Sequence, residues 1–592
     1  MATIPAPVAD LETNLAERVA FEDGWKLIEH FSGLVRESGS PDELEAGDYI
    51  ASELSRLGVE HEVFEPELYL SLPRESWVQV GESRLLAKPP AFSASTGTDG
   101  LAAEVLYVPS STVRGQGDLF TRHVADESID VRGRIVLTEG YAMPAAVEGF
   151  EAAGAVGQIY INPGENVHWG ICTSIWGTPT VSNLSRKPGT PVVAISQPDG
   201  ETLAEQAREG GLDVRVISQL EEGWYRCKLP VATIRGVSDE FALVHGHYDS
   251  WDVGIGDNAV GDATLLELAR IFHEGRDALR RTLKIAWWPA HSTGRYGGST
   301  WFADNFAIEL RKLCVAAINI DSPGCWGATE YDDVMWMAEA EGLCRDAIRD
   351  ATGKEAAHRR PLRAGDYSFN QVGLTSFFML LSNIPAEERE ALGFYPTGGC
   401  GGNIAWHTED DTMGVADRDN LQRDLSVYVT ALCRVLNAGV LPFDFRATLD
   451  ELHGFLDAYQ EMAGELLDLS PAIEEAEALR VELEVLYKRI DRAHVSTQHR
   501  VEHAHGRDYL NRVQVELARI LVPLGYAEGE RFDHDPALPR APIPKLAGVN
   551  RLRAVADERP DLLPFLQNEL RRQVNKVAGA LFDAAELVRR TC

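Results

Sequence analysis

The stretch that most constrains the fold is residues 242–262, ALVHGHYDSWDVGIGDNAVGD, where an apolar run ends abruptly in polar residues and glycines. The apolar start of this stretch predicts a buried strand, and the spacing near its end predicts a helix. His247, Asp249 and Asp257 therefore fall where the chain leaves a strand. Imidazole and carboxylate groups in this setting suit zinc and neighbouring divalent ions. Closure of a loop by the same residues is the alternative that this stretch leaves open.

Strands and helices alternate over residues 228–440, which predicts an α/β domain around a mostly parallel sheet. The expected strands are FALVHG, TLKIAWW, AAINI, VMWMA and SFFMLL. Ligands of such sheets bind beyond the carboxyl ends of the strands. Potential ligands follow the expected strands repeatedly, which favours a metal site over chance placement: His247, His291 with Ser292, Asp321, and His407 in AWHTEDDT.

Three further regions complete the predicted organisation. Residues 1–95 read as helix, helix and strand and are assigned to the α/β domain together with 228–440. Residues 96–227 consist of short β-runs separated by Gly, Pro and Asp, which predicts an inserted β-rich domain. Residues 441–592 carry apolar stripes at helical spacing, which predicts a helical bundle.

The charge balance argues against two classes of partner. The chain has 56 Lys and Arg against 91 Asp and Glu, a formal charge of −35, so we expect no binding to nucleic acid or to an anionic membrane. The eight cysteines are scattered and form no C-x-x-C pair, which indicates reduced thiols. No secretory leader or membrane span is recognised in the sequence, so a cytoplasmic location is expected.

These motifs together resemble the zinc aminopeptidase and glutamate carboxypeptidase family, and within it the branch that includes the transferrin receptor. The resemblance rests on the H-x-D pair at His247, on Asp257 in GDNAVGD, on the acidic residue of NIDSPG and on HTEDDT. It implies that residues 96–227 are a protease-associated domain and that residues 441–592 are a helical dimerisation domain. A homodimer is therefore the expected assembly.

The resemblance also implies roles for individual residues. One metal would be held by His247, Asp257 and Asp321, and a second by Asp257 as a bridge and His407. Asp249 would orient His247. The family's W-x-A-E-E-x-G motif corresponds to WPAHSTG at 288–294, so His291 stands in place of the glutamate base and Ser292 in place of a carboxylate ligand.

This replacement leaves three interpretations open. The protein is a metal-dependent hydrolase of a small amide or peptide, with one metal or a weakened pair and with His291 as proton shuttle. Alternatively, His291 is itself a ligand of a single ion, and the chemistry differs from peptide hydrolysis, for example a lyase reaction. In the third interpretation the protein has lost catalysis and only binds a partner. Zinc is the expected metal, with iron or manganese as alternatives and one or two ions per chain.

The sequence offers few substrate contacts. Arg359 and Arg360 form a basic cluster in an acidic chain, and guanidinium groups bind carboxylates, so an acidic small molecule or a peptide C-terminus is a candidate substrate. Tyr296, Tyr395 and Trp406 are the aromatic residues that could supply the apolar walls of the pocket. A solvated surface is the alternative interpretation of the arginines.

Overall fold

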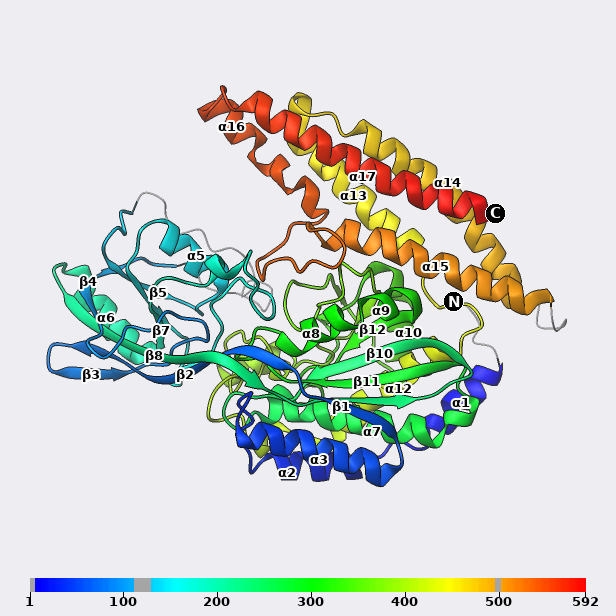
Figure 1. Cartoon of the computed structure of the whole chain (residues 1–592), viewed down its shortest axis with the longest axis horizontal. Helices are drawn as coiled ribbons and strands as arrows, with labels where there is room; N and C mark the ends of the chain where they lie inside the picture. Colours follow the sequence, from blue (N-terminus) through cyan, green and yellow to red (C-terminus); the bar gives the residue numbers. More distant parts are fainter. Residues whose placement is uncertain (1–5, 111–128, 496–501, 592) are drawn as a thin grey trace.

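A computed structural model describes residues 6–110, 129–495 and 502–591 and divides them into three parts (Figure 1). A central α/β domain carries the β-rich insertion on one side and a group of long helices on another. The predicted fold class, an α/β domain with an inserted β-rich domain and a helical C-terminal region, is confirmed.

The central sheet has six strands in the order β1-β9-β11-β10-β12-β15. Strands β10, β11, β12 and β15 run parallel, and β9 and β1 pair antiparallel at one edge. Their bounds are Glu60–Phe64 for β1, Leu229–Ile234 for β9, Ser238–His247 for β10, Arg281–Trp288 for β11, Cys314–Asn319 for β12 and Ser376–Phe377 for β15. Because the parallel strands are buried on both faces, they read as continuous apolar runs.

Helices cover both faces of this sheet. Four helices pack on one face and on each other: α2 (Glu22–Phe31), α3 (Pro41–Leu57), α7 (Val260–Glu274) and α12 (Arg418–Asn437). Helices α8 (Gly297–Asn305) and α9 (Ala307–Leu313) contact the strands from another side, where a second apolar cluster forms around Trp288 and Phe302. Ser40 caps the N-terminus of α3, because its side chain accepts a hydrogen bond from the Glu43 N–H.

One predicted strand of the central sheet is wrong. The run VMWMA forms β13 (Val334–Met335), which pairs with β14 (His358–Arg359) in a separate two-stranded sheet, and it reaches the central sheet through one antiparallel bridge from Trp336 to Phe377 of β15. Periodicity cannot separate a strand of the main sheet from another short buried apolar segment, which explains the error.

The insertion is a seven-stranded sheet in the order β3-β2-β8-β4-β5-β6-β7 with two helices, α5 (Pro144–Ala152) and α6 (Gln197–Arg208). Its strands are β2 (Glu67–Val80), β3 (Ser83–Leu86), β4 (Leu101–Tyr107), β5 (Ile135–Glu139), β6 (Gly157–Ile161), β7 (Val192–Ile195) and β8 (Asp213–Arg226). The predicted boundary at residue 96 is therefore too late, since β2 and β3 already belong to this sheet. The long pairing of β2 with β8 decides the assignment.

The chain enters and leaves the insertion at adjacent points. Strand β1 pairs with β9 up to Phe64 and Leu229, and β2 pairs with β8 from Glu67 and Arg226. Between them, the Cys227 N–H donates to the Pro66 carbonyl over 3.0 Å. The segment VEHEVFEPELYL, predicted as one strand, is therefore divided between two sheets.

The C-terminal region is helical, as predicted. It comprises α13 (Phe445–Ala463), α14 (Ser470–Val495), α15 (Glu502–Tyr526), α16 (Leu552–Glu558) and α17 (Leu563–Thr591), and α17 packs along α14 and α15. No helix in the described ranges combines the length and the apolar character needed to cross a membrane. Seven cysteines in these ranges are free and buried, as expected for reduced thiols, and Cys592 lies outside them.

Candidate metal centre

The predicted ligands meet beyond the carboxyl ends of β10, β11 and β12. His247 is the last residue of β10, and Asp321 follows β12, the neighbouring strand. Gly246 allows this approach, because a Cβ atom at that position would lie 2.6 Å from the Ile320 carbonyl oxygen. The absence of a side chain at Gly246 thus brings Asp321 next to His247.

Asp257 lies between His247 and His407. Its Oδ1 is 3.0 Å from His247 Nε2, and its Oδ2 is 3.0 Å from His407 Nε2. His247 Nε2 is also 3.8 Å from Asp321 Oδ2. The structure therefore brings together His247, Asp257, Asp321 and His407, with Asp257 in a bridging position.

The tautomers of the histidines suit metal binding. His247 Nδ1 contacts the Asp249 carbonyl oxygen at 3.0 Å, and His407 Nδ1 contacts the Trp169 carbonyl oxygen at 2.9 Å. Since a carbonyl oxygen only accepts, each Nδ1 carries a hydrogen, which leaves Nε2 as the nitrogen that can bind a metal. His247 Nε2 and Asp257 Oδ1 are both buried and make no hydrogen bond within the described residues. The donor set fits a divalent cation between them.

Charge in the site also favours a cation. Burial alone lowers the pKa of His247, but the Asp249, Asp257 and Asp321 carboxylates outweigh burial and raise it well above its ordinary value. Burial and the negative charge of Asp257 raise the pKa of Asp321 to about 6. A bound cation would relieve this excess of buried negative charge.

Asp249 contacts both His247 and the loop after β11. Its carboxylate Oδ1 lies 3.5 Å from His247 Nδ1 in an ion pair, and its backbone carbonyl lies 3.0 Å from the same nitrogen. The carboxylate also binds the loop after β11: Oδ1 accepts from the His291 N–H at 3.1 Å, and Oδ2 accepts from the Ser292 N–H at 2.9 Å. Asp249 is therefore a positioning residue for that loop.

The loop after β11 is strained. Ala290, Arg295 and Tyr296 have φ angles of 60°, 49° and 69°, a region that costs residues with a side chain free energy and persists only when the surroundings impose it. The loop closes on itself, because the Gly297 N–H donates to the Ala290 carbonyl at 2.8 Å. This conformation places His291 next to the cluster of candidate metal ligands, where its ring lies against that of His247.

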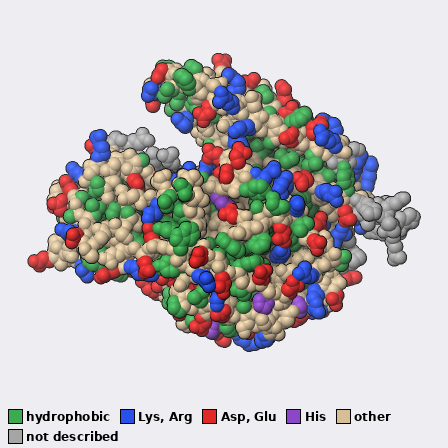
Figure 2. All heavy atoms as spheres, viewed as in Figure 1, with side chains coloured by type: hydrophobic (Ala, Val, Ile, Leu, Met, Phe, Trp, Pro, Cys, Tyr) green, Lys and Arg blue, Asp and Glu red, His purple; other side chains and the backbone are tan. Residues whose placement is uncertain are grey.

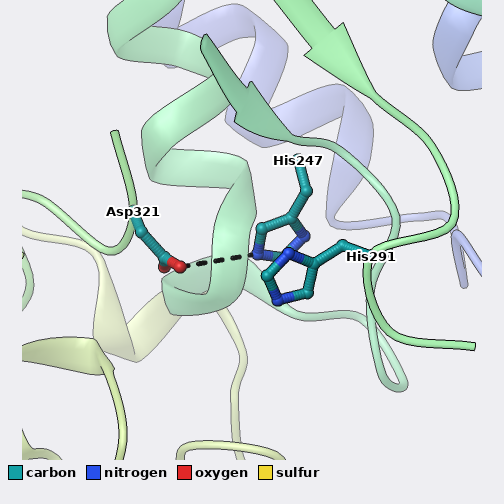
Figure 3. Close-up of side chains that lie close together, drawn as sticks. All are labelled: His247, His291 and Asp321. Atoms are coloured by element: carbon teal, nitrogen blue, oxygen red, sulfur yellow. Dashed lines mark ion pairs between the residues drawn. The ribbon is translucent and has the colours of Figure 1, made fainter. Parts of the chain in front are cut away.

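His291 stacks on His247 (Figure 3), with ring centroids 3.7 Å apart and an angle of 15° between the ring planes. The ligand atoms offered by His247, His291 and Asp321 lie within 4.8 Å of one another. Nitrogen lone pairs lie in the ring planes, so stacked rings direct them side by side and not at one ion. The observed arrangement therefore favours His291 beside the metal over His291 as a third ligand.

Sequence reasoning missed the partner of His291. The Asp366 Oδ2 accepts the Nδ1–H of His291 at 2.8 Å, which leaves Nε2 of His291 facing the cluster. Asp366 lies in the AGDYSF segment, 75 residues further along the chain, and is buried. The only signal was an acidic residue in a Gly-containing turn, which is too common to single out.

Two of the predicted substrate contacts have partners within the fold. Arg359 pairs with Asp333 at 2.5 Å. Arg360 pairs with Glu451 of α13, donates to the Gly525 carbonyl at 2.6 Å and lies over the Tyr526 ring. These contacts give the arginines structural roles and lend no support to substrate binding. Tyr395 lies closer to the cluster, since its hydroxyl is 2.9 Å from Nε2 of His168, whose Nδ1 donates to the carbonyl of Trp406, the residue before His407.

An α/β sheet with a bridging carboxylate between two imidazoles at its strand ends defines a metallopeptidase-like domain. Comparison with known proteins specifies the class. Residues 231–431 match the model of Peptidase family M28, in agreement with the family resemblance stated from the sequence.

Several proteins match part of the chain. The chain is 22% identical to a probable leucine aminopeptidase 2 of Aspergillus oryzae over 267 residues, 45% of this chain and 50% of that protein. It is 27% identical to an inactive zinc metalloprotease of Schizosaccharomyces pombe over 281 residues, 45% of this chain and 33% of that protein. The matched region thus spans half or less of both relatives.

The fold is shared with solved structures. The zinc aminopeptidase BSAP from Bacillus subtilis superposes with a TM-score of 0.52 at 20% sequence identity, over 70% of this chain and 95% of that chain.

Proposed function

We propose that this protein is a metal-dependent hydrolase that holds one divalent ion and cleaves the amide bond of a short peptide or small amide. The observation that carries the proposal is Asp257, whose two carboxylate oxygens each lie 3.0 Å from the Nε2 of a histidine in the acceptor tautomer. Zinc is the proposed ion, because His and Asp ligands suit it and the aminopeptidase from Bacillus subtilis is named as a zinc enzyme.

One ion is proposed instead of two because the two positions differ in ligands. His247, Asp257 and Asp321 supply three donors to the first position. The second position has His407 and the bridging Asp257, while Ser292 occupies the place of a carboxylate. A neutral hydroxyl neither balances the charge of a second dication nor binds zinc strongly.

A bound divalent ion would polarise the substrate carbonyl and lower the pKa of a water molecule. The chain's own residues do the rest. His291 presents Nε2 to the cluster and accepts the proton of the attacking water, while Asp366 holds Nδ1–H. An imidazole suits this transfer because its ordinary pKa lies near neutrality. The aromatic side chains near His407, including Trp406 and Tyr395, would line the substrate pocket.

A protein that only binds a partner is the second candidate. It is favoured by the replacement of both family glutamates and by a relative named as inactive. Such a site would not need to keep five ionisable residues that are buried or largely buried, because these are costly to desolvate without a partner or a metal.

Metal content and turnover test both candidates. The protein is purified without added metal, its metals are measured per chain, and aminoacyl amides, dipeptides and peptides with an acidic C-terminus are offered as substrates. About one equivalent of zinc with release of an amine supports the hydrolase. No metal, with no uptake from zinc solution, would refute it and favour the binding protein.

Assembly and partners follow from the same resemblance. We propose that the C-terminal helices form a homodimer and that a small molecule or short peptide is the substrate. Acidic and basic side chains are interspersed on the face shown in Figure 2, and the expectation that nucleic acid is not a partner rests on the formal charge of −35. The cytoplasmic location remains a prediction.

A further inference from the structure

One loop of the β-rich insertion reaches the metal centre. This bridging loop, residues 166–177, follows β6 and is buried against the α/β domain over residues 171–177. Gly177 has a φ angle of 77°, and a Cβ atom there would lie 2.2 Å from Thr300 Oγ1 of α8. Its N–H donates to the Arg295 carbonyl at 2.6 Å. The loop is thus packed directly against the strained segment that carries His291.

The first contact of the bridging loop is with His407. The Trp169 N–H donates to the His407 carbonyl at 2.9 Å, and the His407 Nδ1–H donates to the Trp169 carbonyl at 2.9 Å. Trp169 is itself held by stacking on Trp251 and by a hydrogen bond from its Nε1–H to Asp252. The insertion therefore sets the tautomer of a candidate ligand that belongs to the α/β domain.

The second contact is a directed chain of hydrogen bonds to His291. The Trp176 Nε1–H donates to Ser368 Oγ at 2.9 Å, and the Ser368 and Ser299 hydroxyls are 2.8 Å apart. The Ser299 hydroxyl donates to Asp366 Oδ1 at 2.6 Å. Because a hydroxyl has one hydrogen to give, Ser299 accepts from Ser368, and every bond points towards the carboxylate.

Asp366 completes this chain. Its Oδ1 accepts from Ser299, and its Oδ2 accepts the Nδ1–H of His291. Four residues of the chain of hydrogen bonds are buried, namely Trp176, Ser368, Ser299 and Asp366. His291, at its end, is partly exposed. A carboxylate fixed on one side by a hydroxyl has a defined orientation, so the ring of His291 has one as well.

We propose that the bridging loop is a positioning element of the active site, which fixes Nδ1 of His407 through Trp169 and Nδ1 of His291 through Trp176, Ser368, Ser299 and Asp366. Both rings then offer Nε2 to the centre occupied by Asp257 and Asp321. This inference rests on the proposed function, because that function assigns His291 as proton acceptor and His407 as a candidate ligand. The hydrogen bonds that orient the two rings exist without metal.

The test uses three Trp→Phe variants of the full-length protein. Trp176→Phe keeps an aromatic ring but removes the N–H that begins the chain to His291. Trp169→Phe removes the bond to Asp252 that anchors the backbone beside His407. Trp224→Phe is the matched control, because Trp224 is exposed on β8 of the same insertion and lies outside the bridging loop.

The first readout is the pair of imidazole ¹⁵N signals of each histidine in metal-free protein, assigned with His→Gln variants. Trp176→Phe should move the His291 signals towards a mixture of tautomers and leave those of His407 in place. Trp169→Phe should do the reverse. The second readout is catalysis and zinc titration, where Trp176→Phe should lower kcat about tenfold with little change in KM or zinc affinity, and Trp169→Phe should weaken zinc binding about tenfold.

Three outcomes decide the inference. Histidine signals that match the control in both loop variants would overturn it. If the wild type binds no zinc, the proposed function fails, but the signals of the metal-free protein still decide the role of the loop. If Trp176→Phe does not fold, Ser368→Ala breaks the same chain from the α/β domain and should shift the His291 signals in the same way.

Discussion

The carboxylate of Asp249 accepts the backbone N–H of Ser292 at 2.9 Å. The same carboxylate accepts from the His291 N–H and from the Ser38 hydroxyl, and Ser38 in turn accepts from the Ala290 N–H. One acidic residue after β10 thus holds the whole beginning of the loop after β11. The position of His291 depends on a residue that does not contact its ring.

Asp249→Asn should therefore damage the loop. The amide offers one acceptor oxygen where the carboxylate offers two, so at least one buried N–H loses its partner, at a cost of about 1–3 kcal/mol in the free energy of unfolding. Loss of the loop's position should also lower kcat. Urea unfolding and steady-state kinetics measure the two effects. Asp239→Asn, at an exposed position on β10, is the control, and an Asp249→Asn protein that matches it in both measurements would contradict the assignment.

Ser292→Glu should restore the second metal position. A carboxylate there would join His407 and Asp257 as a third donor, so the zinc content should rise from about one to about two ions per chain. Ser292→Gln has nearly the same volume without the charge and should keep one ion. Elemental analysis of both variants checks this, and equal metal contents would show that Ser292 does not limit the stoichiometry.

His291→Ala should abolish most turnover without releasing the metal. Loss of a positioned acid–base group lowers rates by about 10²–10⁴-fold, while the stacked ring of His291 does not direct its lone pair at the ion held by His247. Single-turnover rates and zinc titration separate the two effects. Zinc affinity that falls together with the rate would instead identify His291 as a ligand.

Glu43 should make stability depend on pH. Burial raises the pKa of Glu43 to about 8, although the Tyr248 hydroxyl donates to its carboxylate. In the unfolded chain the ordinary pKa applies, so from about pH 4.5 to 8 the folded protein retains a proton that the unfolded chain has lost. Stability is therefore full below this range and falls as pH rises, by up to about 1.4 kcal/mol per pH unit.

Glu43→Gln removes this proton linkage. Its Tm should approach or exceed that of the wild type as pH rises from 5 to 8. Glu45→Gln on the same helix is a control, because the Glu45 side chain is 57% exposed. A Tm difference between wild type and Glu43→Gln that stays constant across this pH range would refute the shifted pKa.

Arg360→Met should lower stability and leave KM unchanged. The guanidinium joins the α/β domain to the helices through Glu451, the Gly525 carbonyl and the Tyr526 ring. Its removal leaves a half-buried carboxylate without this partner, at a cost of about 1–3 kcal/mol. Thermal unfolding and KM for an acidic peptide test this together, and a large rise in KM would return Arg360 to the substrate pocket.

Strand ends explain why the ligand group was visible in the sequence. His247, Asp321 and the residues after β11 follow buried apolar runs, and parallel strands bring their carboxyl ends to one edge of a sheet. Asp257 was visible because it lies in a Gly-rich turn between strand and helix.

The supporting roles of other residues were not visible, for physical reasons. Asp366, Trp169 and Trp176 lie in loops with no periodicity, and their contacts join parts of the chain that are far apart in sequence. The second role of Asp249, in holding the loop after β11, was not predicted, because the spacing of His247 and Asp249 carries no information about a loop that lies about 40 residues further along the chain. The arginine cluster failed as a substrate site because composition cannot tell an internal ion pair from a binding surface.

The adjacent entry and exit of the insertion have a consequence for how the two sheets relate. Cys227 and Pro66 are hydrogen-bonded neighbours, so removal of residues 67–226 would leave two ends that a short hairpin turn can join without changing the strand order of the central sheet. Such a shortened chain would keep the central sheet and lose the bridging loop, which we propose orients His291 and His407. The strand order of the central sheet and the orientation of the candidate histidines thus depend on different parts of the chain, which meet where Cys227 is hydrogen-bonded to Pro66.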